Sequence, residues 1–186
     1  MRTPTFSSHR QYGFTLVELI AVILIMGILS ATALPRFMDF GADARKAALK
    51  GVASTVKTAA TTFRQKMELQ GLHKRVHVKA EYNGGKINVY YGHPGLSWST
   101  NWQYLIDLNA VEFSSDNRAA TCNRDDVDYC TSYVDNEWGA KGIASLYIYP
   151  PGYDTEANND GGNCYVEYNL KDRGKNFEVN TVTEGC

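Results

Sequence analysis

The chain has 186 residues with 20 acidic and 19 basic side chains, and its formal net charge is −1. This balance gives no general reason to expect binding to nucleic acids or to anionic membranes. The length allows one domain with a core besides a long helix.

The first 13 residues contain Arg2, His9 and Arg10 and no acidic side chain. A positive segment before an apolar run is expected to stay in the cytoplasm. An ordinary secretory signal has a shorter apolar core, which is followed by a small-residue cleavage site. Here the favourable cut lies before the apolar run, so the run is expected to remain as an anchor.

The next stretch, residues 14–34, is predicted to be a membrane helix. Its 21 residues contain one charged side chain, Glu18, and at about 1.5 Å per residue they span roughly 31 Å, the thickness of a bilayer's hydrocarbon core. A carboxylate there costs about 2.5–3.5 kcal/mol unless it is paired. Because a plain signal anchor has no use for such an acid, Glu18 is expected to be functional. A cut between Gly13 and Phe14 would create an α-amino group that pairs with Glu18 of a second chain.

Gly13 to Glu18 reads Gly-Phe-Thr-Leu-Val-Glu before an apolar helix, which closely resembles the processing site of type IV pilins and the related pseudopilins. The resemblance implies that a prepilin peptidase cuts after Gly13 and methylates the new amine of Phe14. It also implies that Glu18 guides entry of each subunit into the growing filament.

Further matches to this family are Gly27 and Pro35, which lie where its members loosen or bend the helix. A proline inside a helix removes one hydrogen bond and clashes with the preceding turn, so flexibility is expected there. Residues 43–53 look like the mannose-sensitive haemagglutinin subgroup of pilins. The resemblance is strong from Gly13 to about Val56, and beyond that it is one of layout.

The helical pattern resumes after Pro35 and is predicted to end at Gly71. Apolar residues recur there in steps of three or four, which places them on one stripe, with the charged residues mostly off it. This segment is predicted to continue the membrane helix and to pack its stripe against a sheet. The stripe contains Phe37, Phe40, Ala44, Ala48, Val52, Val56, Ala60, Phe63 and Met67.

The remaining residues, 72–186, are predicted to form a small β-sheet head. A turn at Asn83-Gly84-Gly85 precedes the first clear strand, and residues 93–95 are expected to break it. Residues 102–108 are predicted to be a short helix, and residues 114–136 are predicted to be polar and irregular. The predicted strands are residues 86–91, 142–149, 164–170 and 177–182.

Two polar runs are candidate ligand sites. The basic residues 73–79 fit a solvated face or a subunit contact better than nucleic-acid binding, and His73 and His77 are expected to be ordinary surface histidines. Residues 154–163 are rich in the oxygen ligands that calcium takes, but their spacing is not that of an EF-hand. A plain Asx- and Gly-rich loop is therefore preferred, and no cofactor is expected. The calcium candidates are Asp154, Glu156 and Asp160.

Four cysteines, all after residue 120, indicate an oxidising compartment, and no Cys-x-x-Cys spacing suggests zinc. Of the three connectivities, Cys122 with Cys130 and Cys164 with Cys186 is preferred. The first pair could close a surface loop. The second would join the far ends of two antiparallel strands, a C-terminal bridge that the resemblance to pilins also favours.

The overall expectation is an α+β chain with the type IV pilin fold, a long N-terminal helix packed on a small antiparallel sheet. Its segments would be a cleaved leader (1–13), a transmembrane and filament-core helix (14–35), an amphipathic helix (36–71) and a disulfide-bonded head (72–186). No catalytic motif such as a P-loop, Gly-x-Ser-x-Gly or His-Glu-x-x-His occurs, so an enzyme is not expected.

The resemblance implies a pilus subunit that serves attachment, adhesion and biofilm formation. Before assembly it would cross the bacterial inner membrane once, and afterwards it would lie in an extracellular fimbrium. Expected partners are other copies of the chain, a prepilin peptidase and N-methyltransferase, an inner-membrane assembly platform with its ATPase, minor pilins, and a surface or glycan receptor of unknown identity.

Two alternatives stay open. A minor pilin or type II secretion pseudopilin would use its head to bind a ligand or a secreted substrate. A single-pass membrane protein with an unrelated periplasmic activity would keep its first 13 residues and form no filaments.

Overall fold

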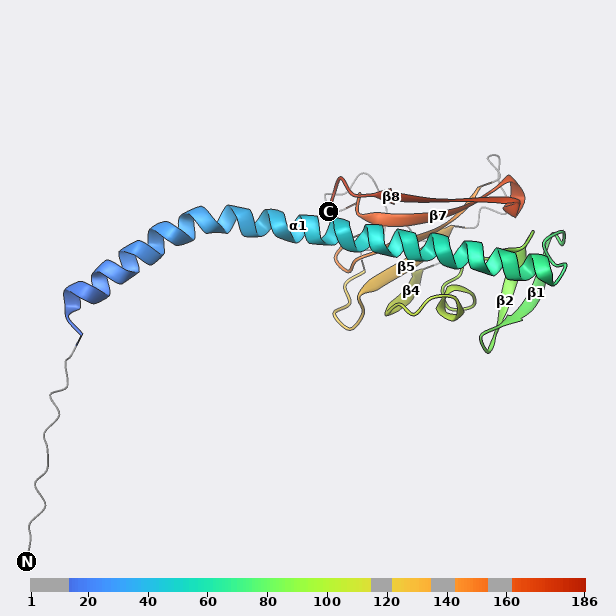
Figure 1. The fold of residues 1–186 in the computed structure, drawn as a ribbon, viewed down its shortest axis with the longest axis horizontal. Helices are drawn as coiled ribbons and strands as arrows, with labels where there is room; N and C mark the ends of the chain where they lie inside the picture. The colour runs from blue at the N-terminus through green and yellow to red at the C-terminus, as the bar shows by residue number, and fades with distance from the viewer. Residues whose placement is uncertain (1–13, 115–121, 135–142, 154–161) are drawn as a thin grey trace, which may run out of the picture. The chain divides into compact units, whose positions relative to one another are not determined.

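The computed structural model describes residues 14–114, 122–134, 143–153 and 162–186, with all side chains except those of residues 34–39 and 114 (Figure 1). The chain forms two compact units, Met1–Gly41 and Ala42–Cys186. The helix α1, Leu16–Leu69, contributes to both units, and all strands belong to the C-terminal unit.

A glycine cap ends α1 where the sequence predicts it. Gly71 has a φ of 71°, a left-handed conformation that a residue without a Cβ adopts easily. The N–H of Gly71 donates to Glu68 O and the N–H of Leu72 donates to Met67 O, at 3.0 and 2.8 Å. These two bonds are the Schellman arrangement, which satisfies carbonyls that the last turn leaves unpaired.

The buried face of α1 in the C-terminal unit confirms the predicted stripe from Val52 onward and corrects it before that point. Each step of four residues turns about 40° past a full helical turn, so repeated steps of four leave the buried face. Leu49, seven residues before Val56, returns to that face and is fully buried. The predicted positions Phe40, Ala44 and Ala48 are exposed, and the side chain of Phe37 is not described.

Two sheets form the rest of the C-terminal unit. One has three antiparallel strands in the order β1-β2-β3, and the other has five in the order β4-β5-β6-β7-β8. In the larger sheet β5 to β8 are antiparallel, as predicted, whereas β4 pairs with β5 in parallel. The strands are β1 (Val78–Tyr82), β2 (Gly85–Tyr90), β3 (His93–Pro94), β4 (Ala110–Ser114), β5 (Tyr129–Val134), β6 (Ala144–Tyr149), β7 (Tyr165–Lys171) and β8 (Asn176–Val182).

The C-terminal half of α1 packs on both sheets (Figure 1). Val56 and Ala60 belong to a core that includes Leu146 and Ile148 of β6 and Tyr168 of β7. One turn further along, Phe63 and Met67 join a second core with Ala80 of β1 and with Ile87 and Val89 of β2. A single helical stripe therefore holds the two sheets in one unit.

Two disulfides join Cys122 to Cys130 and Cys164 to Cys186, which is the pairing that the sequence predicts. Cys164 precedes β7, and Cys186 lies beyond the end of the antiparallel strand β8. The first pair connects the loop before β5 to β5 itself, where Cys122 and Cys130 are fully buried among Tyr147 and Tyr149. Both bridges lie in the C-terminal unit.

Three local predictions are wrong. Residues 93–95 do not simply end β2, because His93–Pro94 pairs back with it as β3. The stretch predicted to be irregular contains β5, and β4 had no predicted counterpart. The predicted helix after Trp102 is a single 3₁₀ turn, Trp102–Tyr104, although Trp102 is fully buried as expected.

Candidate functional site

The candidate assembly site begins at the start of α1, where Thr15 and Glu18 form a capping box. The backbone N–H and the hydroxyl of Thr15 both donate to Glu18 Oε2, at 3.0 and 3.1 Å. In return the backbone N–H of Glu18 donates to Thr15 Oγ1 at 3.3 Å. This reciprocal pairing satisfies backbone donors that the first helical turn leaves without partners.

The capping box gives the carboxylate of Glu18 a role within its own chain that the sequence analysis did not consider. Thr-x-x-Glu before an apolar run is a helix-start signature that can be read from sequence, and the prediction overlooked it. Glu18 therefore stabilises the first turn of α1, and it is also the predicted assembly residue. The assembly role itself stays a prediction.

Only one of the two Glu18 carboxylate oxygens is used by the box. Oε2 accepts both bonds from Thr15, whereas Oε1 accepts none from any residue that the structure describes. Phe14, whose amine is the predicted partner, is 83% exposed at the same end of the helix. The arrangement leaves a fixed carboxylate oxygen open to a donor from outside the chain.

The apolar surface that follows Glu18 is unusually exposed. One described helix, over Leu16–Ala33, is long and apolar enough to cross a membrane, and none of its 18 residues is buried. Exposed large apolar patches mark sites that contact other molecules or lipid. The exposed large side chains are Leu16, Val17, Leu19, Ile20, Val22, Ile23, Leu24, Ile25, Met26, Ile28 and Leu29.

The polar groups inside this apolar segment are satisfied locally. The hydroxyl of Ser30 donates to Met26 O at 2.7 Å, and the hydroxyl of Thr32 donates to Leu29 O at 2.9 Å. Such bonds to preceding carbonyls let hydroxyl groups lie in an apolar environment without an unpaired donor. The segment therefore presents an apolar surface apart from its first turn.

The two predicted flexible positions lie in continuous helix. A Cβ added at Gly27 would meet no atom within 4 Å, so no contact with the described residues requires glycine there. The helical backbone also continues through Pro35, whose side chain is not described. Flexibility at Gly27 and Pro35 stays a prediction.

Several predicted site residues lie outside the described part of the chain. Gly13 and the leader are among them, as are the calcium candidates Asp154, Glu156 and Asp160. Within the described residues no group of three or more His, Cys, Asp or Glu side chains is arranged to hold a metal ion. Calcium binding at residues 154–163 therefore stays untested.

The structure also reveals a buried histidine that the sequence gave no sign of. His93 is fully buried between α1 and the turn before β8, and its Nε2 lies 2.5 Å from Arg64 Nη1 and 3.3 Å from Lys175 O. Burial, with the Arg64 charge as a second cause, lowers the pKa of His93 to about 4. His93 is therefore neutral at ordinary pH and accepts a hydrogen bond from Arg64.

The two histidines expected on the surface differ from one another. His77 is exposed and stacks on Tyr90, with 4.8 Å between ring centroids. His73 is half-buried, and its Nδ1 atom is buried and has no hydrogen-bond partner among the residues that the structure describes. The expectation is therefore correct for His77 and wrong for His73.

Comparison with known proteins finds a family match at the start of the chain and of α1. Residues 8–34 match the family called the prokaryotic N-terminal methylation motif. That range contains the capping box, the predicted cleavage site and the whole exposed apolar segment of residues 16–33. No solved structure matches the chain.

Three curated relatives are named as pilus proteins. A fimbrial protein of Moraxella nonliquefaciens is 47% identical over 57 residues, which is 31% of this chain and 37% of that protein. The type IV narrow pilus major component PilA5 of Thermus thermophilus is 48% identical over 50 residues, 27% of this chain and 43% of the relative. The type IV major pilin protein PilE1 of Neisseria gonorrhoeae is 45% identical over 53 residues, 28% and 32% of the two chains. Each match spans less than half of the relative's length.

Proposed function

We propose that this chain, a type IV pilin by its N-terminal methylation motif, is a structural subunit of a pilus filament. The observation that carries the proposal is the exposed apolar helix of residues 16–33, which begins in a capping box with one carboxylate oxygen unused. The curated relatives named as major pilins and fimbrial proteins support the same function.

The apolar side chains of residues 16–33 must be shielded from water both before and after assembly. Burying one large apolar side chain is worth about 1.5–3 kcal/mol, so exposing this segment to water would cost many times that amount. A bilayer covers the segment before assembly, with the chain anchored in the inner membrane. In an extracellular filament the same segments of neighbouring subunits cover one another, which bundles them into the filament core.

Glu18 gives the bundle its register. Its Oε1 atom is free of bonds within the described chain, and the capping box holds the carboxylate at the helix start. Cleavage after Gly13 places a positive amine on Phe14, and this amine pairs with Glu18 Oε1 of the adjacent subunit. In this pair each charge compensates the other within an apolar environment, where an unpaired charge is costly.

The finer parts of the proposal concern processing and use. A prepilin peptidase and N-methyltransferase removes residues 1–13 and methylates Phe14, and an inner-membrane platform with its ATPase drives assembly together with minor pilins. The filament serves adhesion and biofilm formation. Residues 43–53 suggest the mannose-sensitive haemagglutinin subgroup, an assignment that rests on sequence pattern alone.

Mass spectrometry of the chain in sheared filaments tests this function. The expected mature subunit begins at Phe14, carries one methyl group on its amine and is abundant in the sheared material. An intact N-terminus would contradict the proposal, and so would the absence of the chain from filaments. A low abundance beside another pilin would instead indicate a minor subunit.

A further inference from the structure

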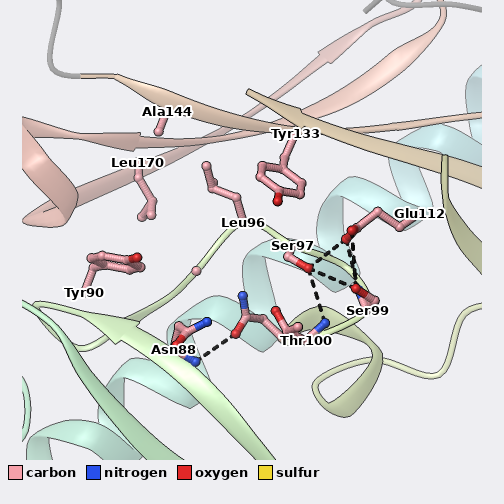
Figure 2. Close-up of a pocket in the computed structure, with 12 residues that line it drawn as sticks. Asn88, Tyr90, Leu96, Ser97, Ser99, Thr100, Glu112, Tyr133, Ala144 and Leu170 are labelled. Carbon is pink, nitrogen blue, oxygen red and sulfur yellow. Dashed lines mark hydrogen bonds between the residues drawn. The ribbon is translucent and has the colours of Figure 1, made fainter. Parts of the chain in front are cut away.

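A pocket in the C-terminal unit takes no part in the proposed assembly contact. Its volume is about 350 Å³, and it lies between the two sheets, bounded on one side by the loop that joins β3 to the 3₁₀ turn (Figure 2). Its wall contains residues of β2 from one sheet and of β4, β5, β6 and β7 from the other. This volume is near the small end of the range for ligand pockets, so a small molecule fits better than a peptide.

The pocket wall carries a negative charge that no described cation balances. Glu112 of β4 is half-buried, and it is the one charged side chain among the residues that line the pocket in the described structure. No lysine, arginine or histidine that the structure describes forms an ion pair with it. A half-buried carboxylate attracts a cation more strongly than an exposed one, because less water lies between the charges. The pocket therefore favours a positively charged ligand over a phosphate or a carboxylate.

The carboxylate of Glu112 is held in place with one acceptor site open. Its Oε2 accepts the hydroxyl of Ser97 at 2.8 Å and the backbone N–H of Ser99 at 3.1 Å (Figure 2). Among the described residues its Oε1 accepts one bond, from the hydroxyl of Ser99 at 3.3 Å. Each carboxylate oxygen has two lone pairs, so Oε1 can accept a further donor. Because these bonds exist without a ligand, little ordering of the carboxylate is left to be paid on binding.

An aromatic ring lies on the same face of the sheet as Glu112. Glu112 pairs with Thr131 of β5, and Tyr133 is two residues further along β5. Side chains two residues apart in a strand point to the same face, and both Glu112 and Tyr133 line the pocket. The face of a tyrosine ring attracts a cation electrostatically. A carboxylate and an aromatic ring on paired strands suit an ammonium group.

The rest of the wall has an apolar part and a neutral polar part. Leu96, Ala144 and Leu170 are each at most 7% exposed and line the apolar part. The side-chain amide of Asn88 and the hydroxyl of Thr100 line the polar part and form no hydrogen bond with any residue that the structure describes. Both groups contain an oxygen that can accept from an ammonium group, which has three donors.

From these features we infer that the pocket binds a small organic amine with an apolar body. The ammonium group donates to Glu112 Oε1 and lies against the ring of Tyr133, and the hydroxyl oxygen of Thr100 accepts a second hydrogen. The apolar body packs on Leu96. The inference goes beyond the filament function, because every group in it belongs to the C-terminal unit and none takes part in the proposed assembly contact.

Binding is measured by NMR on the full chain in phosphatidylglycerol nanodiscs, without filaments and in a buffer that contains no amine. The probes are phenethylamine, phenethyl alcohol and phenylacetate, which share an apolar body and differ in charge. Empty nanodiscs correct for binding of the amine to lipid, and amide shifts of residues 88 and 95–101 locate each probe. The amine is expected to produce saturable shifts at the pocket with an affinity at least about tenfold higher than that of the alcohol, and phenylacetate is expected to produce none.

Matched variants test the role of the carboxylate. Glu112→Gln removes the charge and keeps an oxygen that can accept from Ser97 and Ser99. It is expected to weaken binding of phenethylamine about ten- to hundredfold, the effect of one lost hydrogen bond to a charged group, and to leave the affinity for the alcohol unchanged. Glu167→Gln makes the same change at a half-buried position of β7 that does not line the pocket, and amine binding is expected to stay unchanged.

Four results would overturn the inference. Two concern the wild-type chain, namely no saturable shift with phenethylamine and equal affinities for the amine and the alcohol. The third is equal weakening of both probes by Glu112→Gln, which would make the carboxylate a purely structural group. The fourth is pocket shifts that follow protein concentration without a probe, which would identify a second copy of the chain as the occupant. None of them bears on cleavage after Gly13 or on filament formation, so failure here is distinguishable from failure of the pilus function.

Discussion

The two ends of α1 have the same secondary structure and opposite surroundings. Over residues 16–33 no residue is buried, and Glu18, Ser30 and Thr32 form side-chain hydrogen bonds only with nearby residues of the same helix start or helix. In the C-terminal unit the helix buries six side chains against two sheets, from Leu49 to Met67. The C-terminal end of α1 therefore buries its apolar face within a single chain. The N-terminal end leaves its apolar surface exposed and needs lipid or further copies of the chain to cover it.

Removal of the Glu18 charge, at the N-terminal end of α1, should have the largest effect on filament yield. Glu18→Gln keeps the capping box, since glutamine also fits its third position, but it removes the charge. Filament yield is expected to fall at least about tenfold, the effect of roughly 1.4 kcal/mol per contact, while membrane insertion and cleavage continue. Electron microscopy and immunoblots of sheared filaments measure the yield.

Thr15→Ala is the matched control for this prediction. It removes the hydroxyl partner and keeps the Glu18 charge, so filaments are expected to persist with a slightly less stable helix start. If Thr15→Ala abolished filaments and Glu18→Gln did not, the capping box rather than the charge would be the assembly determinant.

Replacing one leucine by alanine at each end of α1 compares how much the two ends contribute to the free energy of unfolding. Leu49→Ala removes a fully buried side chain and is expected to lower the free energy of unfolding of the C-terminal unit by about 2–5 kcal/mol. Leu29→Ala, at a position 61% exposed, is expected to leave that free energy within about 0.5 kcal/mol. Denaturant unfolding followed by tryptophan fluorescence measures both. Equal effects would contradict the separation of the two ends.

Both disulfides lie in the C-terminal unit, together with the buried end of α1. Replacing Cys164 and Cys186 by serine opens a loop with a sequence separation of 22 residues and is expected to cost about 3 kcal/mol. Opening the Cys122–Cys130 bridge, with a separation of 8, is expected to cost less, at about 2.5 kcal/mol. Thermal unfolding of the two double variants against wild type checks the order, and a reversed order would show that chain entropy does not set it.

The smallest expected effect is a pH dependence that His93 gives to the C-terminal unit. Its pKa is about 4 in the folded chain and near its ordinary 6.5 when unfolded, so the unfolded state binds the proton first as pH falls. The contribution of His93 to the free energy of unfolding is therefore constant above about pH 6.5 and falls as the pH drops toward 4. At pH 5 the free energy of unfolding is lower by about 2 kcal/mol. Arg64 and Lys175 face the ring from α1 and from the turn before β8, and Glu68 lies close to Arg64.

Two variants check this dependence by denaturant unfolding at pH 7 and pH 5. In wild type the free energy of unfolding is expected to be lower at pH 5 than at pH 7 because of His93. His93→Gln is expected to lose this part of the decrease. His77→Gln, at an exposed position, is expected to retain it. A difference that survives in His93→Gln would assign the pH dependence to other groups.

The sequence predicted the features that local chemistry decides. The apolar run with its single acid, the Asn83-Gly84 turn and the glycine cap at Gly71 each follow from a few neighbouring residues. The paired strands β7 and β8, with the bridge from Cys164 to Cys186, follow from one short turn.

What the sequence did not predict depends on contacts between distant residues. β3 and β4 are short strands that exist because β2 and β5 offer them partners, and β4 pairs in parallel with a strand that follows a long connection. The burial of His93 needs Arg64 and Lys175 from elements far apart in the chain. The pocket likewise collects Asn88, Asn101 and Glu112 from three separate segments. The Thr15–Glu18 capping box is the exception, a local signal that was available and not used.

The most direct test of the central claim is an atomic structure of the assembled filament. The account predicts a subunit that begins at Phe14, with its methylated nitrogen within about 4 Å of Glu18 Oε1 of the neighbouring subunit. A filament in which Glu18 contacts only Thr15 of its own chain, with no neighbouring amine in reach, would contradict it.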